Sequence, residues 1–225
     1  MGFFVECKSI TERGSRIMAA TRKKDTIKVQ RSATISRKTG ETDITISLSI
    51  DGTGKADIST GIGFFDHMLH AFARHGLFDM TVDAKGDLEV DGHHTVEDCA
   101  IVLGTAIKEA VGDKKGIRRY GHFILPMDEA LVLCAVDLCN RPYFVLEGEE
   151  KIKSYMVGDF DTQLVREFFY SISYAAGMNL HFQILQGTNS HHIIEAMFKA
   201  FAKALDIATV TDPRIVDVLS TKEAL

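Results

Sequence analysis

The motif His-His-x-x-Glu occurs twice in this chain, at 93–97 and again at 191–195. Each copy follows a predicted strand and turn, and each opens a segment in which apolar residues recur at helical spacing. Repetition of one motif at the same place in two similar segments predicts a tandem duplication of two α+β units with an internal pseudo-twofold axis. Chance recurrence is the alternative, and the identical position on both helices disfavours it.

The spacing of apolar residues predicts the other elements of both halves. Apolar and polar residues alternate strictly over 42–50, which predicts a half-buried strand that ends in a turn at Asp51 and Gly52. We expect further strands at 77–84, 131–138, 143–146 and 178–185, and helices at 63–75, 95–111, 164–176 and 192–205. Each half is therefore predicted to run strand–strand–helix–strand–helix.

Composition limits the class of protein. The chain has 225 residues, of which 45% are hydrophobic, and this fits one domain or two small packed halves. We expect a flexible basic leader over 1–25, a first α+β half over 26–116 and a second over 117–222, packed as one domain. The net charge of −5 argues against nucleic acid as a partner, and no apolar run is long enough for a membrane span. The four cysteines form no CxxC pair, so we expect reduced thiols and a cytoplasmic protein.

The duplicated motif has the chemistry of a metal site. His93 and Glu97 lie four residues apart on one helix face and can point at one ion. The adjacent His94 is rotated by about 100°, so it suits a different ion. Two copies therefore predict two metal sites that draw ligands from both motifs, and we hypothesise that some ligands come across a subunit interface. Nitrogen and oxygen ligands without thiolate suit Mn, Fe, Ni or Zn. Solvated histidines at helix ends are the simpler alternative.

Other candidate residues are less specific. His67 and His70 share a helix face, but a histidine among Phe65, Met68 and Leu69 can equally be a core residue. Arginine and lysine side chains that could bind a phosphate follow the first motif or lie near the C-terminus, although each alone can be a solvated surface residue. From the residues alone, a metal-dependent lyase, a hydrolase and a metal-storing scaffold all stay open.

Several longer motifs together resemble the imidazoleglycerol-phosphate dehydratase family, over roughly residues 28–222. The motifs that carry the resemblance are GIGFFDHML at 61–69, HGLFD at 75–79, DGHHTVED at 91–98, DEAL at 128–131, RPY at 141–143 and SHHIIEA at 190–196. Their order and length make this signal more specific than either copy of the short motif.

The resemblance implies two tandem ferredoxin-like halves, each a four-stranded sheet with helices on one face. It implies a homo-oligomer of 24 subunits with active sites at the subunit interfaces and two Mn²⁺ ions in each site. The implied activity is that of a carbon–oxygen lyase of histidine biosynthesis. Such an enzyme removes water from D-erythro-imidazoleglycerol phosphate and forms imidazole-acetol phosphate.

The family's functional positions carry over residue by residue. The metal-binding positions fall on His67, His93, His94, Glu97, Glu167, His191, His192 and Glu195, and Glu167 stands where the family often has histidine. The substrate-phosphate positions fall on Arg119, Arg141, Lys199, Ser220 and Lys222. Glu223 follows Lys222 where the family usually has glycine. The candidate catalytic residues are Glu41, Glu97 and His67, with Glu41 or Glu97 as the carboxylate that moves a proton.

Two alternative functions would use the same metal ligands. A metallohydrolase would use a metal-bound hydroxide and release phosphate or an amide product rather than form a ketone. A non-enzymatic shell assembled by metal would associate without turnover and would not need the basic residues. Some members of the family carry a fused histidinol-phosphatase domain. A chain of 225 residues has no room for one, so we expect a monofunctional enzyme.

Overall fold

The computed structural model describes residues 30–224, and the expected leader at 1–25 lies outside this range. The first half contains β1 (Ser32–Lys38), β2 (Thr42–Ser49), β3 (Ala56–Ser59), α1 (Gly63–Gly76), β4 (Asp79–Gly86) and α2 (His93–Val111). The second contains β5 (Tyr120–Met127), β6 (Ala130–Asp137), β7 (Tyr143–Glu147), the 3-10 helix η1 (Glu149–Lys151), β8 (Met156–Val157), β9 (Phe160–Asp161), α3 (Leu164–Ala176), β10 (Asn179–Gln186) and α4 (Ser190–Thr209).

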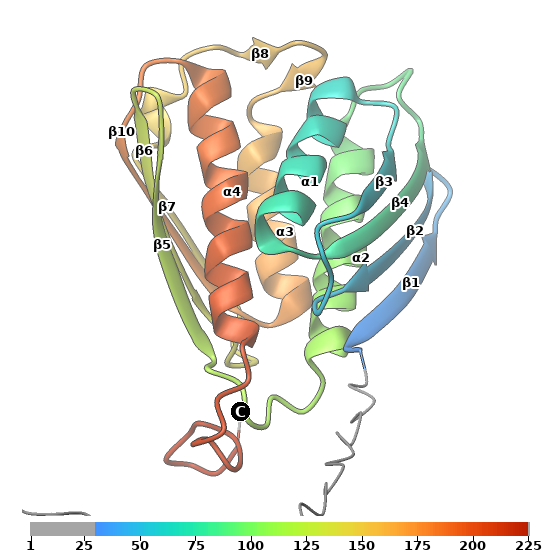
Figure 1. Cartoon of the computed structure of the whole chain (residues 1–225). Helices are drawn as coiled ribbons and strands as arrows, with labels where there is room; N and C mark the ends of the chain where they lie inside the picture. The colour runs from blue at the N-terminus through green and yellow to red at the C-terminus, as the bar shows by residue number, and fades with distance from the viewer. Residues whose placement is uncertain (1–29, 225) are drawn as a thin grey trace, which may run out of the picture.

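The two halves have the same sheet topology. The strand order is β1-β2-β4-β3 in the first sheet and β5-β6-β10-β7 in the second. In each sheet the first three strands in this order pair antiparallel with their neighbours, and the fourth pairs in parallel with the third. Both sheets carry their helices on one face, and the helices pack against each other between the sheets (Figure 1). The predicted α+β duplication with four-stranded sheets is confirmed.

The predicted order of elements within each half was incomplete. Each half has three strands before its first long helix, not two, and the second half adds the short β8–β9 hairpin. The missed strands have weak apolar patterns: β3 has four residues, and β5 contains Gly121 and Pro126. Pro126 is tolerated because β5 is an edge strand, which needs fewer backbone donors.

All four long helices begin at the same end of the molecule (Figure 1). Side-chain oxygens satisfy the free backbone N–H groups there: Asp91 accepts from the N–H of His93, and Asn189 accepts from those of His191 and His192. Both copies of the His-His-x-x-Glu motif therefore lie at this end. The other end of α4 is about 30 Å away, since the helix has 20 residues.

The core lies mainly between the helices and contains residues of both halves. Phe72 of α1 stacks on Phe201 of α4 with ring centroids 5.4 Å apart, and Phe168 of α3 stacks on Phe198 at 5.0 Å. All four rings are fully buried. The first pair holds α1 against α4 and so fixes the distance between the histidines that these two helices carry, and the second pair holds α3 against α4. None of the described helices could span a membrane.

Candidate metal centre and anion pocket

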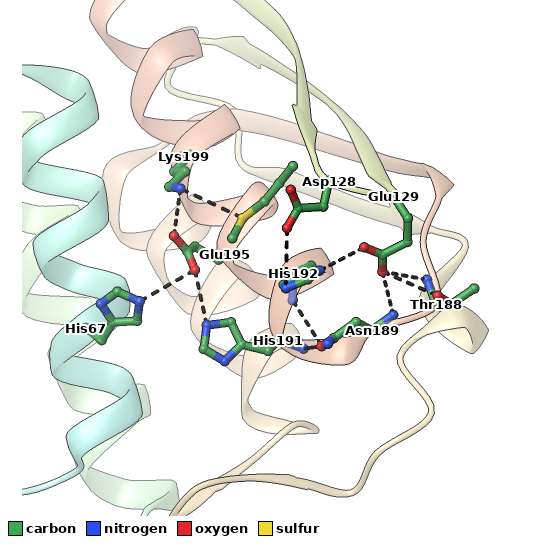
Figure 2. A network of polar contacts seen from close by, with 10 residues as sticks. His67, Asp128, Glu129, Thr188, Asn189, His191, His192, Glu195 and Lys199 are labelled. Atoms are coloured by element: carbon green, nitrogen blue, oxygen red, sulfur yellow. Dashed lines mark hydrogen bonds and ion pairs between the residues drawn. The ribbon is translucent and has the colours of Figure 1, made fainter.

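A cluster of three possible metal ligands forms where α1 meets α4. His67 Nε2 lies 3.5 Å from Glu195 Oε2, and His191 Nε2 lies 3.1 Å from the same oxygen (Figure 2). One ligand atom from each residue falls within 4.8 Å of the other two. Two imidazole nitrogens and a carboxylate oxygen at this spacing suit a divalent first-row metal ion, so the donor chemistry fits the expected group.

Glu195 is the buried member of this cluster. Burial alone would raise the pKa of its carboxyl, but the hydrogen bond and charge of Lys199 outweigh it, and the pKa lies below its ordinary value. Lys199 Nζ lies 2.6 Å from Glu195 Oε1, which leaves Oε2 for the two histidines (Figure 2). The structure therefore places Lys199 on the metal cluster and not with the other residues expected at the phosphate.

A carboxylate holds the second histidine of the motif on α4. Glu129 lies in the β5–β6 turn, and its Oε2 is 2.8 Å from His192 Nδ1 (Figure 2). Its Oε1 accepts from the backbone N–H groups of Thr188 and Asn189. These hydrogen bonds, first that from His192, lower the pKa of Glu129 to about 2, and the pKa of His192 is raised in turn. With Nδ1 held by Glu129, Nε2 of His192 is the nitrogen that remains for a metal ion, and Asp128 Oδ2 lies 3.7 Å from it (Figure 2).

The first copy of the motif has a different carboxylate in this role. His94 Nδ1 lies 3.0 Å from Asp87 Oδ2 and 3.9 Å from Glu41 Oε2. The hydrogen bond that His94 donates to Asp87 raises the pKa of His94. His93 Nε2 lies 3.9 Å from Glu97 Oε2, so these two groups face each other more loosely than His191 and Glu195 do. The adjacent histidines of each motif therefore contact different carboxylates, and their binding of two different ions stays a prediction.

His93 and Glu167 line one pocket of about 680 Å³ between α2, α3 and the β8–β9 hairpin. Its walls also include the carboxylates of Asp91, Asp159 and Asp161. Glu167 on α3 shares this pocket with His93 of α2. In the same way, His67 on α1 lies beside the histidine and glutamate of α4. His93 and Glu167 lie outside the cluster of His67, His191 and Glu195.

A second pocket lies at the opposite end of the molecule, beside the C-terminal segment (Figure 1). Four of the five residues expected at the phosphate line it: Arg119, Arg141, Ser220 and Lys222. Arg119 is buried, donates to both oxygens of Asp137 and donates to the carbonyl of Leu219. It therefore holds the C-terminal segment in place. Glu223 has φ 58°, a left-handed conformation that favours the glycine usual at this position.

Within one protomer, the metal cluster and the basic pocket are too far apart to form a single site. The metal cluster lies at the N-terminal end of α4 and the basic pocket lies beyond its C-terminal end, about 30 Å away along the helix. A phosphorylated substrate of a few carbon atoms cannot span that distance. Sequence analysis also missed Asp87 and the anchoring role of Glu129. Glu129 belongs to the DEAL segment at 128–131, whereas the turn residue Asp87 has no sequence signal of its own.

Fold and site together define a duplicated α+β protein whose histidine and carboxylate groups could hold a metal ion. The imidazoleglycerol-phosphate dehydratase family model matches residues 60–205. The imidazoleglycerol-phosphate dehydratase of Lachnoclostridium phytofermentans is 63% identical over 194 residues, which cover 86% of this chain and 98% of that protein. That of Acetivibrio thermocellus is 62% identical over 191 residues, covering 85% and 97%.

Solved structures agree with these sequence relatives. The dehydratase from Staphylococcus aureus superposes with a TM-score of 0.72 at 38% identity, covering 80% of this chain and 99% of that one. The Pyrococcus furiosus enzyme superposes with a TM-score of 0.73 at 38% identity, covering 85% and 100%. The chain therefore belongs to the imidazoleglycerol-phosphate dehydratase family. The predicted activity, that of a dehydratase of histidine biosynthesis, is confirmed.

Proposed function

We propose that this chain converts D-erythro-imidazoleglycerol phosphate to imidazole-acetol phosphate and water, in the cytoplasm, with two Mn²⁺ ions in each active site. The observation that carries the proposal is the convergence of His67, His191 and Glu195 on one point, within a chain of this family. The free, buried thiols of Cys99, Cys134 and Cys139 agree with a reducing compartment.

The residues that would hold the metal are the seven histidines and glutamates of the two motifs and α1, with Glu167 as an eighth ligand. Bound Mn²⁺ supplies Lewis-acid stabilisation of negative charge on the substrate's imidazole ring. Asp87 and Glu129 fix the rings of His94 and His192 in the orientation that offers Nε2.

The substrate's phosphate is proposed to bind Arg119, Arg141, Ser220 and Lys222. Arginine pairs bidentately with phosphate oxygens, and binding of this remote group orients the reacting end of the substrate. Lys199 was expected here too. Within one protomer its ion pair with Glu195 keeps that carboxylate charged, and its contact with the phosphate stays a prediction for a site shared between subunits.

Proton transfer is proposed for Glu41, with Glu97 and His67 as ligands that border the reacting carbon. Glu41 is more than half exposed, and its carboxylate lies beside His94 without being anchored to it. It can therefore turn toward a substrate held at the histidines. The reaction breaks the C–O bond next to the ring and one C–H bond, so a group that takes and returns a proton is required.

The distance between the two sites supports an assembly in which one subunit supplies the metal ligands and another supplies the phosphate pocket. We propose a homo-oligomer of 24 subunits with such shared sites. Light scattering with and without chelator tests whether metal contributes to this assembly. Equal particle mass in both conditions would show that the metal does not hold subunits together.

The activity test uses chelator-stripped protein, imidazoleglycerol phosphate and added Mn²⁺. Formation of the enolisable ketone is followed by its absorbance in alkali. Ketone that forms only when Mn²⁺ is returned supports the proposal. Release of inorganic phosphate without ketone would favour a metallohydrolase, and bound metal with no turnover would favour a structural shell.

A further inference from the structure

We propose that Arg37, Thr42 and Asp98 form a clasp whose role is to position Glu41 for proton transfer. The inference rests on the proposed function, because it takes Glu41 as the group that moves the proton. None of the three clasp residues is assigned to substrate or metal, so they are positioning residues rather than catalytic ones.

The clasp ties the β1–β2 hairpin to α2. Asp98 is buried on α2, one turn beyond His94. Its Oδ2 accepts from Thr42 Oγ1 at 2.5 Å and from Arg37 Nη1 at 2.6 Å. Both strands of the hairpin are therefore bonded to one carboxylate oxygen of the helix that carries the first metal motif.

Glu41 lies in the turn that the clasp holds. Thr39 and Thr42 close the turn through the bond from the Thr39 N–H to the Thr42 carbonyl. The hydroxyl of Thr39 also accepts from the backbone N–H groups of Glu41 and Thr42. The backbone of Glu41 is thereby fixed relative to α2, while its side chain is more than half exposed beside His94. Such a carboxylate is pre-positioned at little entropic cost.

The second half of the molecule provides an internal comparison. The β5–β6 hairpin corresponds to the β1–β2 hairpin, and in its two-residue loop Glu129 stands where Glu41 stands. By the same register and the matching place on α4, Leu125, Ala130 and Ala196 replace Arg37, Thr42 and Asp98. All three are buried and apolar, at 9%, 1% and 0% exposure. The fold therefore forms this junction without any clasp.

The way in which Glu41 and Glu129 are held explains why the β1–β2 hairpin needs the clasp and the β5–β6 hairpin does not. Glu129 is fixed through its own side chain, by His192 and by two backbone N–H groups. The side chain of Glu41 has no such anchor, because Asp87 occupies Nδ1 of His94. The turn that carries Glu41 must therefore be held by its backbone and by neighbouring side chains.

The first experiment compares Thr42→Val with Thr42→Ser in the Mn²⁺-loaded enzyme. Valine keeps the shape of threonine but cannot donate to Asp98, whereas serine keeps the hydroxyl. We expect kcat to fall about 10-fold or more in Thr42→Val and to recover in Thr42→Ser, since misplacement of a reacting group by about 1 Å can cost about 100-fold. KM and Mn²⁺ affinity, measured by titration calorimetry, should stay within about twofold.

Thr45→Val is the matched control, because Thr45 lies on the same strand and its hydroxyl, among residues 30–224, bonds to Ser36 alone, on the outer face of the sheet. It should retain the kcat of the wild type. Wild-type kcat in Thr42→Val, or in Glu41→Gln, would overturn the inference. So would an equal loss of Mn²⁺ affinity in Thr42→Val, since the clasp would then act on the metal motif.

A triple variant, Arg37→Leu, Thr42→Ala and Asp98→Ala, gives the first half the residues of the second. We expect it to fold, to bind Mn²⁺ and to have a reduced kcat. Failure to fold would mean that the clasp serves stability, which overturns the inference. If the wild type itself yields no ketone from imidazoleglycerol phosphate, the proposed function fails, and this outcome is distinct from an active wild type with a fully active Thr42→Val.

Discussion

Glu129 Oε2 lies 2.8 Å from His192 Nδ1, and this contact joins the β5–β6 turn to the first turn of α4. It orients the imidazole ring before any metal arrives. The hydrogen bond from His192, followed by those from two backbone N–H groups, lowers the pKa of this carboxylate to about 2 and keeps it charged. A histidine at an exposed helix end would otherwise sample several rotamers, and the turn removes that freedom.

We predict that Glu129→Gln lowers Mn²⁺ affinity about 10- to 100-fold, because loss of a carboxylate behind a ligating histidine has this effect on metal sites. Titration calorimetry measures the affinity directly. Glu147→Gln is the control, since this exposed glutamate on β7 lies away from the motif and contacts Gln183. Equal affinity in both variants would contradict an anchoring role.

His67 and His70 give a second matched pair on α1. His67 lies within the cluster of His191 and Glu195, whereas His70 is exposed and outside that cluster. His67→Gln should abolish binding of at least one Mn²⁺ per subunit, and His70→Gln should retain full stoichiometry. Metal content after dialysis checks both. Loss of metal in the His70 variant would contradict the assignment of the metal site to His67, His191 and Glu195.

Arg119 and Arg141 line the same pocket but differ in burial. Arg119→Lys loses the bidentate bond to Asp137 and the bond to the Leu219 carbonyl, so we expect the free energy of unfolding to fall by about 2 kcal/mol. Arg141→Lys should raise KM without changing stability. Denaturant titration measures the stability of both variants, and steady-state kinetics measures their KM. An Arg119→Lys variant as stable as the wild type would contradict the expected loss of stability.

Gly104 of α2 lies directly against α3. A Cβ there would lie 2.7 Å from Ala175 Cβ and 2.8 Å from the Ile172 carbonyl oxygen. Gly104→Ala should therefore cost about 1–3 kcal/mol of stability through overpacking. Gly40→Ala serves as the control, since nothing lies within 4 Å of the added carbon and the backbone conformation is ordinary. Denaturation midpoints of the two variants test the difference.

Much of the fold could be predicted because its signals are local. The helix at 164–176 was predicted with its observed bounds, and the strand at 42–50 ends one residue earlier than expected. The edge strands β1, β3 and β5 were missed, since an edge strand is stabilised by its neighbour more than by its own apolar pattern. The duplicated motif predicts different ions for adjacent histidines, because one residue step along a helix turns the side chain by about 100°. That assignment stays a prediction.

The sequence by itself determined the duplication, the ligand types and the family, all of which depend on residue identity and short spacing. Only the tertiary structure decided that His67 joins His191 and Glu195, that Lys199 pairs with Glu195, and that the basic pocket lies at the far end of α4. Those contacts join segments more than a hundred residues apart, or depend on which way a side chain turns. They follow from the packing of two helix layers between two sheets, which no local pattern of residues specifies.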